Sequence, residues 1–239
     1  MERLLRQDAT VVVVELDPAA VAWVEGHPAG SRVVRVVGSA AEQSVAQEAA
    51  DRAREAGGLD GWVNNAAVFR DAALDTVPAH DLLDLITLNL APAVTGCATA
   101  VRAFLAAGSG GAIVNVSSHQ ARRAVRGAPA YATAKAAVEG LTRAVAVDYG
   151  PAGIRANAVA LGSIATERYS AYLEGQAPAG AARTAEQMAR LHPLGRVGTV
   201  DEIAAAVAWL LSDESSFISG AVLPVDGGRA ARGSDPEER

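Results

Sequence analysis

The segments Ala112-Ile113-Val114-Asn115-Val116 and Ile154-Arg155-Ala156-Asn157-Ala158 lie on either side of an Ala-rich stretch, residues 129–149. Each short segment is mostly apolar, and the stretch between them has its apolar residues at helical spacing. Two strands joined by a helix form a βαβ unit, in which the strands are parallel. This part of the chain therefore predicts an α/β fold built on a parallel sheet.

The same alternation continues in both directions along the chain. Nearly all-apolar strands are typical of a sheet with helices on both faces. Right-handed crossovers between such strands give an open, doubly wound sheet. The predicted strands cover residues 10–15, 32–37, 61–64, 112–116, 154–158 and 221–225, and the predicted helices cover residues 18–24, 41–56, 78–106, 129–149 and 200–211.

The length and composition fit one domain in a reducing, cytoplasmic setting. The chain has 239 residues, is 50% apolar and carries a net charge of −6. An acidic chain without a basic face argues against general binding of nucleic acid or of an anionic membrane. The N-terminal apolar run is too short for a signal peptide or a membrane span. Cys97 is the single cysteine, so we expect neither a disulfide framework nor a thiolate metal cluster.

Residues 1–228 are expected to form a single domain with one irregular part. Residues 162–195 contain no clear strand and have an amphipathic piece at 185–191. We interpret this part as a lid over a cleft, although a surface excursion would show the same pattern. The polar residues 229–239 are expected to be a disordered tail.

Lys135 is the only lysine in the chain; the other basic residues besides histidine are arginines. Arginine can replace lysine on a solvated surface, but not where a compact ammonium must act beside another group. Tyr131 lies four residues earlier and shares a helix face with Lys135. A nearby ammonium favours the phenolate and lowers the pKa of a tyrosine. The pair is a candidate proton-transfer site.

A second polar group could hold the substrate oxygen. Ser118 follows the predicted strand 112–116, so its hydroxyl and the Tyr131 phenol could face one carbonyl. Ser117 competes for this role, and serines after strands are also common turn formers. Asn89 lies in an otherwise apolar helical stretch, where a local hydrogen bond to the backbone is the alternative to a catalytic role.

Six elements occur together: Asn64-Asn65-Ala66-Ala67, Asn89, Ser117-Ser118, Tyr131-x-x-x-Lys135, the block 157–166, and the block from Pro193-Leu194-Gly195 to Asp226-Gly227-Gly228. In this order they resemble the short-chain dehydrogenase/reductase family over residues 1–228. The resemblance implies a Rossmann-like fold, a homotetramer with helices 78–106 and 129–149 at one interface, and no metal. It also implies hydride transfer between a nicotinamide cofactor and a small secondary alcohol or ketone.

The resemblance further implies a role for each matching residue. Tyr131 would be the general acid/base, and Ser118, favoured over Ser117 by its spacing, would orient the substrate oxygen. Lys135 would lower the Tyr131 pKa and bind the nicotinamide ribose, and Asn89 would hold a water that links Lys135 to solvent. The remaining implied cofactor contacts are Asn65, Ala66, Ile164 and Thr166.

Glu15 indicates the cofactor. It ends the predicted strand 10–15, at the family position that faces the adenosine ribose. A carboxylate accepts hydrogen bonds from the ribose hydroxyls and repels a 2′-phosphate, so NAD is favoured over NADP. The alternative role, capping the next helix, suits Asp17 before Pro18 better than it suits Glu15.

One family element does not match. The family opens with a strand and a Gly-rich turn that brings a helix N-terminus to the cofactor pyrophosphate. Residues 1–7 resemble the end of that helix, so the missing strand would lie centrally, between strands 10–15 and 61–64. Each buried backbone group left unpaired costs about 1–3 kcal/mol. We therefore expect the functional protein to begin upstream of Met1.

The substrate and the activity itself have alternatives. Arg122, Arg123 and Arg126 lie between Ser118 and Tyr131 and could favour an acidic substrate or a 3-oxoacyl thioester on an acidic carrier protein. A solvated or subunit-contact face would show the same cluster. The alternative to an enzyme is a non-catalytic nucleotide-binding or scaffolding relative.

Overall fold

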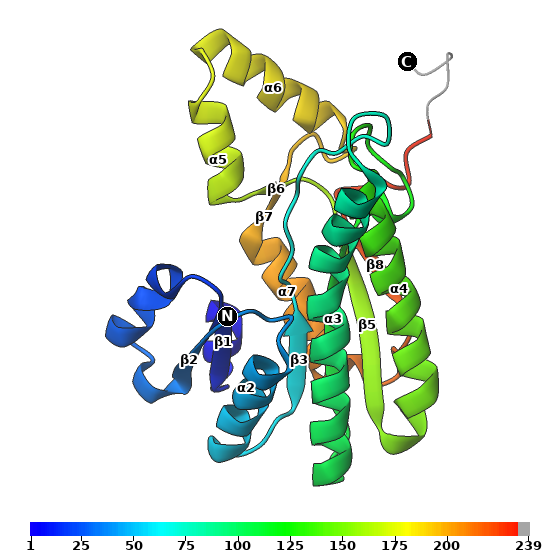
Figure 1. The fold of residues 1–239 in the computed structure, drawn as a ribbon. Helices are drawn as coiled ribbons and strands as arrows, with labels where there is room; N and C mark the ends of the chain where they lie inside the picture. The colour runs from blue at the N-terminus through cyan, green and yellow to red at the C-terminus, as the bar shows by residue number, and fades with distance from the viewer. Residues whose placement is uncertain (234–239) are drawn as a thin grey trace.

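The computed structural model describes residues 1–233 and shows parallel strands covered by helices (Figure 1). The strands are β1 Val11–Glu15, β2 Val33–Val37, β3 Gly61–Asn64, β4 Gly111–Ser118, β5 Ile154–Leu161, β6 Ile164–Ala165, β7 Gly198–Thr199 and β8 Val222–Val225. The α-helices are α1 Glu2–Leu5, α2 Gln43–Glu55, α3 Ala79–Ala107, α4 Pro129–Tyr149, α5 Glu167–Glu174, α6 Pro178–Arg190 and α7 Val200–Leu211. The parallel α/β class predicted from the sequence is confirmed.

The strands form separate sheets. The central sheet has the order β3-β4-β5-β8, and β1 pairs with β2 in what we call the N-terminal strand pair. Within residues 1–233, β1 and β3 do not pair with each other. The four valines of β1 are only half-buried, whereas β4 is buried along almost its whole length.

The core of the central sheet has two layers. Successive side chains of a strand point to opposite faces, so β4 contributes to both layers. Ile113 packs with Phe104 and Ile154 under α3 and α4. Val114 and Val116 pack on the other face with Val159 and with Leu210 of α7. This two-sided core fixes the end of β4, where Ser118 lies.

A buried polar network joins the core elements. Asn64 at the end of β3 donates to Asn115 Oδ1 of β4 at 2.8 Å, and Asn115 donates to Thr142 Oγ1 of α4 at 2.9 Å. Gly96 lets α3 come close to this network, because a Cβ there would collide with Asn64 Oδ1. The network ties α4, which carries Tyr131 and Lys135, to the sheet.

Helix α3 is, within residues 1–233, long and apolar enough to cross a membrane when only length and composition are tested. It nevertheless contacts α2, α4 and β3 along its length. It also buries the polar residues Asn89 and Thr99. Part of its apolar surface therefore packs within this fold, while Leu83, Leu88, Val94 and Leu105 remain exposed.

The segment 162–195, called the lid segment below, contains α5 and α6 (Figure 1). Unlike the sequence prediction, it includes a short strand, β6, which pairs with β7. The predicted helix 18–24 is a 3₁₀ helix, Pro18–Gly26, and Asp17 Oδ1 caps it by accepting from Ala19 N at 2.9 Å.

Two arginines at the start of the expected disordered tail contact the domain. Arg229 donates to Ser163 Oγ at 2.9 Å, and Arg232 donates to the Arg190 carbonyl at 2.7 Å. These hydrogen bonds join Arg229 and Arg232 to the lid segment, and disorder of residues 229–239 stays a prediction. Residues 234–239 lie outside the described residues.

Candidate active site

Ser118, Tyr131 and Lys135 meet at the carboxyl end of the central sheet. Ser118 is the last residue of β4, and Tyr131 lies in the first turn of α4. Pro129 begins this helix, as is common for proline at the first helical position. The strand end and the next helix therefore position the hydroxyl and the phenol together.

Contacts distinguish the two serines. Ser118 hydrogen-bonds the Tyr131 phenol, and its Oγ also accepts from Gln120 N at 3.2 Å. Ser117 points the other way: its Oγ lies 3.3 Å from Glu139 Oε1 and 3.4 Å from the Lys135 carbonyl. The geometry thus favours Ser118 as the partner of Tyr131.

Lys135 is buried, with 3% of its surface exposed. Its Nζ donates to the Val116 carbonyl at 2.7 Å and lies 5.6 Å from the centroid of the Tyr131 ring. Burial lowers the pKa of Lys135 to about 8. An ammonium has three donors, and within residues 1–233 the other two have no protein acceptor.

The pKa of Tyr131 differs from the sequence expectation. Burial raises it above the ordinary value, while the Ser118 hydrogen bond and the positive charge of Arg168 act to lower it. Lys135 was expected to lower this pKa, but its ammonium sits over the ring and bonds the Val116 carbonyl. In this structure desolvation outweighs the charges around the phenol.

Two residues that the sequence interpretation missed contact this group. The rings of Phe69 and Tyr131 pack edge to face with centroids 5.2 Å apart. The Arg168 guanidinium carbon of α5 lies 5.3 Å from the centroid of the Phe69 ring. Phe69, Tyr131 and Arg168 come from three distant segments, and no spacing rule in the sequence links such segments. The one sequence signal was that Arg168 closely follows Thr166, a predicted cofactor contact.

Asn89 supports the loop after β3. Its Oδ1 accepts from Val68 N, and its Nδ2 donates to the Leu85 carbonyl, both at 2.9 Å. The bond to Leu85 is the local backbone hydrogen bond that the sequence left as the alternative role, and the bond to Val68 joins distant parts of the chain. Asn89 therefore positions the chain that leads to Phe69, and its water-relay role stays a prediction.

Comparison with known proteins gives the family. A family profile described as enoyl-(acyl carrier protein) reductase matches residues 1–230. Levodione reductase of Leifsonia aquatica is 31% identical over 96% of this chain and 88% of its own. A levodione reductase crystal structure superposes with a TM-score of 0.84 at 30% identity, covering 96% of this chain and 91% of that one. The chain is a short-chain dehydrogenase/reductase.

Two further relatives are informative. The cis-4-hydroxycyclohexanecarboxylate dehydrogenase of Sinomonas cyclohexanicum is 40% identical over 80% of this dehydrogenase/reductase and 73% of its own chain. The gluconate 5-dehydrogenase of Burkholderia cenocepacia J2315, solved with NADP and tartrate, has a TM-score of 0.81 and 30% identity, covering 94% of this chain and 87% of that one. The family uses nicotinamide cofactors.

Four of the implied cofactor residues follow the carboxyl ends of β3 and β5, the two strands on either side of β4. Asn65 and Ala66 follow β3 and are exposed, and Ile164 and Thr166 follow β5. Ligands of open α/β sheets bind at this edge. Glu15 lies apart from them, on β1 of the N-terminal strand pair, where its Oε1 accepts from Leu16 N at 2.8 Å.

The polar groups of this dehydrogenase/reductase fit the two riboses of a dinucleotide. A buried ammonium with two free donors beside a phenol suits a ribose diol, and Glu15 Oε2 has no protein partner in residues 1–233. The same residues contain no strand joined to a helix N-terminus by a turn with two or more glycines. Lys135 and Glu15 therefore suit the two riboses of the cofactor. Residues 1–233 contain no Gly-rich turn that would bind its pyrophosphate.

A buried charged cluster lies behind Ser118. His119 is 7% exposed, and its pKa is lowered to about 4 by burial, by the Arg229 charge and by His192, against the opposing charge of Asp226. Asp226 accepts from Gly228 N at 2.9 Å and from Ala230 N at 2.7 Å. The cluster joins β4, the lid segment and the chain after β8.

Two arginines proposed for substrate binding are bound to protein groups instead. Arg122 Nε pairs with the buried Glu139 at 3.1 Å, and Arg123 donates to the Arg232 carbonyl at 2.8 Å. Arg126 is exposed. These contacts stabilise the loop between Ser118 and Tyr131, so Arg122 and Arg123 are occupied in this conformation.

Proposed function

We propose that this dehydrogenase/reductase interconverts a secondary alcohol and a ketone, with Tyr131 as general acid/base. The observation that carries the proposal is the meeting of the Ser118 hydroxyl, the Tyr131 phenol and the Lys135 ammonium at the end of β4. A carbonyl oxygen beside the hydroxyl and phenol would find a hydrogen bond and a proton source. Membership in a family of oxidoreductases that act on CH–OH groups supports the proposal.

Each residue has a step in ketone reduction. The nicotinamide, when bound, supplies the hydride to the carbonyl carbon. Tyr131 donates its phenolic proton to the carbonyl oxygen, which becomes the alcohol. Ser118 donates a hydrogen bond that holds this oxygen, and the positive charge of Arg168 stabilises the phenolate that remains. In oxidation the Tyr131 phenolate removes the alcohol proton.

The shifted pKa sets the expected pH dependence. Because burial raises the Tyr131 pKa, the phenolate that oxidation requires becomes populated only at alkaline pH. Alcohol oxidation should therefore speed up as the pH rises through the Tyr131 pKa. Ketone reduction requires the protonated phenol and should slow over the same range.

The substrate is proposed to be a small alcohol or ketone. The relatives' names include levodione, gluconate and a hydroxycyclohexanecarboxylate, which supports small oxygenated substrates. The alternative, a 3-oxoacyl thioester on a carrier protein, rested on the arginines after Ser118. It loses support because Arg122 and Arg123 bond Glu139 and the Arg232 carbonyl.

NAD is proposed as the cofactor because Glu15 would accept hydrogen bonds from the adenosine ribose and repel a 2′-phosphate. The gluconate 5-dehydrogenase was solved with NADP, so family likeness alone favours neither NAD nor NADP.

A homotetramer is proposed because α3 and α4 expose the apolar residues Leu83, Leu88, Val94, Leu105 and Val147. A cytoplasmic location is proposed from the single, free and buried Cys97.

The test combines cofactor binding with turnover. NADH and NADPH are titrated into the protein, and secondary alcohols, including cis-4-hydroxycyclohexanecarboxylate, are screened with NAD and NADP at alkaline pH. The proposal predicts NADH binding together with reduction of NAD by at least one alcohol. Binding without turnover of any alcohol class would contradict it and would support a non-catalytic nucleotide-binding or scaffolding relative.

A further inference from the structure

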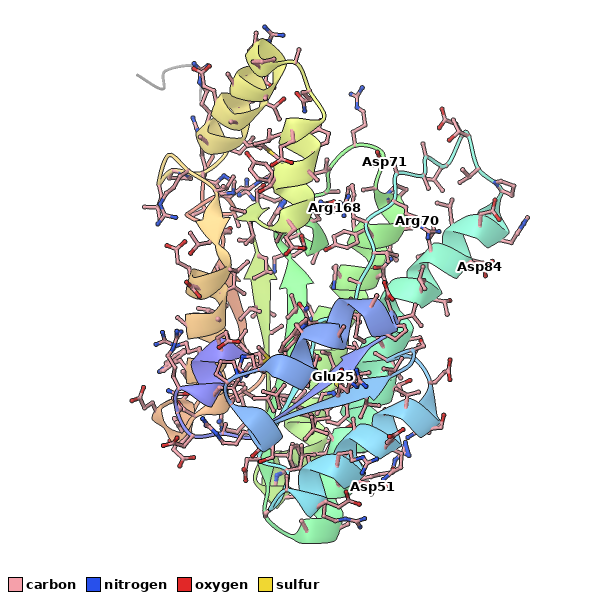
Figure 2. The ribbon with its side chains drawn as sticks, turned by 90° about the vertical axis from the view of Figure 1, so that its left-hand side faces the viewer. Glu25, Asp51, Arg70, Asp71, Asp84 and Arg168 are labelled. Carbon is pink, nitrogen blue, oxygen red and sulfur yellow. The ribbon has the colours of Figure 1, made fainter. Side chains whose placement is uncertain are left out.

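Arg168 is a positively charged residue of the lid segment. It contacts Phe69, and Phe69 in turn contacts Tyr131. Arg168 is the second residue of α5, and Thr166 caps this helix by accepting from Tyr169 N at 3.3 Å. Its guanidinium packs on Phe69 at 5.3 Å, and Phe69 packs on Tyr131 at 5.2 Å. Figure 2 shows Arg168 on the side of the molecule where Arg70 and Asp71 follow β3.

The guanidinium is held in place and yet keeps its donors free. A cation–π contact with Phe69 restrains the guanidinium, and an arginine fork binds carboxylates through two hydrogen bonds. Arg168 is exposed, and it forms no ion pair with any carboxylate of residues 1–233. Its charge nevertheless reaches the phenol, since it acts to lower the Tyr131 pKa.

Other arginines near Ser118 and Tyr131 differ in this respect. Arg122 is paired with Glu139, Arg123 bonds a carbonyl, and Arg229 bonds Ser163 Oγ at 2.9 Å. Those three are anchors of the fold. Arg168 instead has no hydrogen-bond partner within residues 1–233, and it contacts Phe69, the ring that packs on Tyr131.

We propose that Arg168 binds a carboxylate of the substrate, so that the preferred substrate is a hydroxy acid or oxo acid. Phe69 contacts both Arg168 and Tyr131, so the carboxylate and the reacting carbinol lie at different ends of the substrate. A hydroxycycloalkane carboxylate with its two groups on opposite ring carbons separates them in this way. The proposal rests on the proposed oxidoreductase function and names its substrate class.

The test compares one substrate with and without its charge. cis-4-Hydroxycyclohexanecarboxylate and its methyl ester are oxidised by the wild type and by the Arg168→Gln and Arg168→Glu variants. Arg183→Gln is the matched control, since Arg183 is an exposed arginine on α6 of the same lid segment. The readout is the ratio of kcat/KM for the acid to kcat/KM for the ester, because any change at Tyr131 affects both substrates.

The acid-to-ester ratio should fall by about tenfold or more in Arg168→Gln, mainly through KM, and further in Arg168→Glu. It should stay at the wild-type value in Arg183→Gln. An equal loss for acid and ester in Arg168→Gln, or the same fall in Arg183→Gln, would overturn the proposal.

A binding measurement separates this proposal from the proposed function. Calorimetry in the presence of NADH follows cyclohexanecarboxylate, which cannot be oxidised at a hydroxyl. Its Kd should rise about tenfold in Arg168→Gln, while cyclohexanecarboxamide should bind both proteins alike. If no alcohol is turned over but this difference holds, the proposed function fails and the carboxylate site stands. If alcohols are turned over but Arg168→Gln binds cyclohexanecarboxylate as tightly as the wild type, only the carboxylate site fails.

Discussion

The central sheet and the N-terminal strand pair carry two ends of one proposed cleft but are built differently. β4 is buried along almost its whole length, with Ile113 and Val114 fully enclosed. β1 is half-buried throughout and pairs only with β2 in residues 1–233. The proton-transfer residues therefore take their positions from the core around the central sheet. The end that carries Glu15 depends on far fewer buried contacts.

Core substitutions should separate the two regions most strongly. Phe104 is 1% exposed in the core under α3 and α4, so Phe104→Ala should lower the free energy of unfolding by about 3–5 kcal/mol. Val12 of β1 is half-buried, so Val12→Ala should cost about 1 kcal/mol. Chemical denaturation measures both. Equal losses would show that the two regions share one core.

Removal of the Ser118 hydroxyl should cost about 100-fold in kcat, because the group holds the reacting oxygen. The same change should move the pH profile of alcohol oxidation upward, since the Ser118 hydrogen bond acts to lower the Tyr131 pKa. Steady-state kinetics of Ser118→Ala tests both effects. Ser117→Ala is the control, because Ser117 bonds Glu139. A larger loss of kcat in Ser117→Ala than in Ser118→Ala would assign the substrate oxygen to Ser117.

The buried His119 should make the catalytic region sensitive to acid. Unfolded His119 takes up a proton near pH 6.5, whereas the folded form resists protonation until about pH 4. Its contribution to stability is complete above pH 6.5 and is lost as the pH falls toward 4. His119→Gln should reduce the acid-induced loss over this window by about 2 kcal/mol.

Unfolding experiments at several pH values between 4 and 6.5 measure this difference. His80→Gln serves as the control, because His80 is exposed at the start of α3. Acid curves that are the same for His119→Gln and the wild type would show that burial and the Arg229 charge do not hold His119 neutral.

At the other end of the cleft, Glu15→Ala should change cofactor choice by about tenfold. The lost carboxylate no longer repels a 2′-phosphate, so kcat/KM for NADP should rise relative to that for NAD. Asp17→Ala is the control, because Asp17 caps the following 3₁₀ helix. A cofactor ratio that is unchanged in Glu15→Ala would remove Glu15 from the cofactor site.

The sequence predicted what depends on local periodicity. The βαβ unit from β4 to β5 follows from its apolar spacing, and the same spacing places Tyr131 and Lys135 on one helix face. The contact of Arg168 with Phe69 joins segments distant in sequence, and no local pattern encodes it. The Tyr131 pKa is raised mainly by burial. The sequence shows which charged residues lie near Tyr131 along the chain, but not how deeply the phenol is buried.

Tyr131→Phe tests the central claim, that this phenol transfers the proton. The substitution removes one oxygen and keeps the ring that packs against Phe69. The most active alcohol found in the screen should be oxidised about 10²–10⁴-fold more slowly, while NADH binds with an unchanged Kd. Retention of wild-type turnover, or a loss of turnover matched by an equal loss of NADH affinity, would contradict the account.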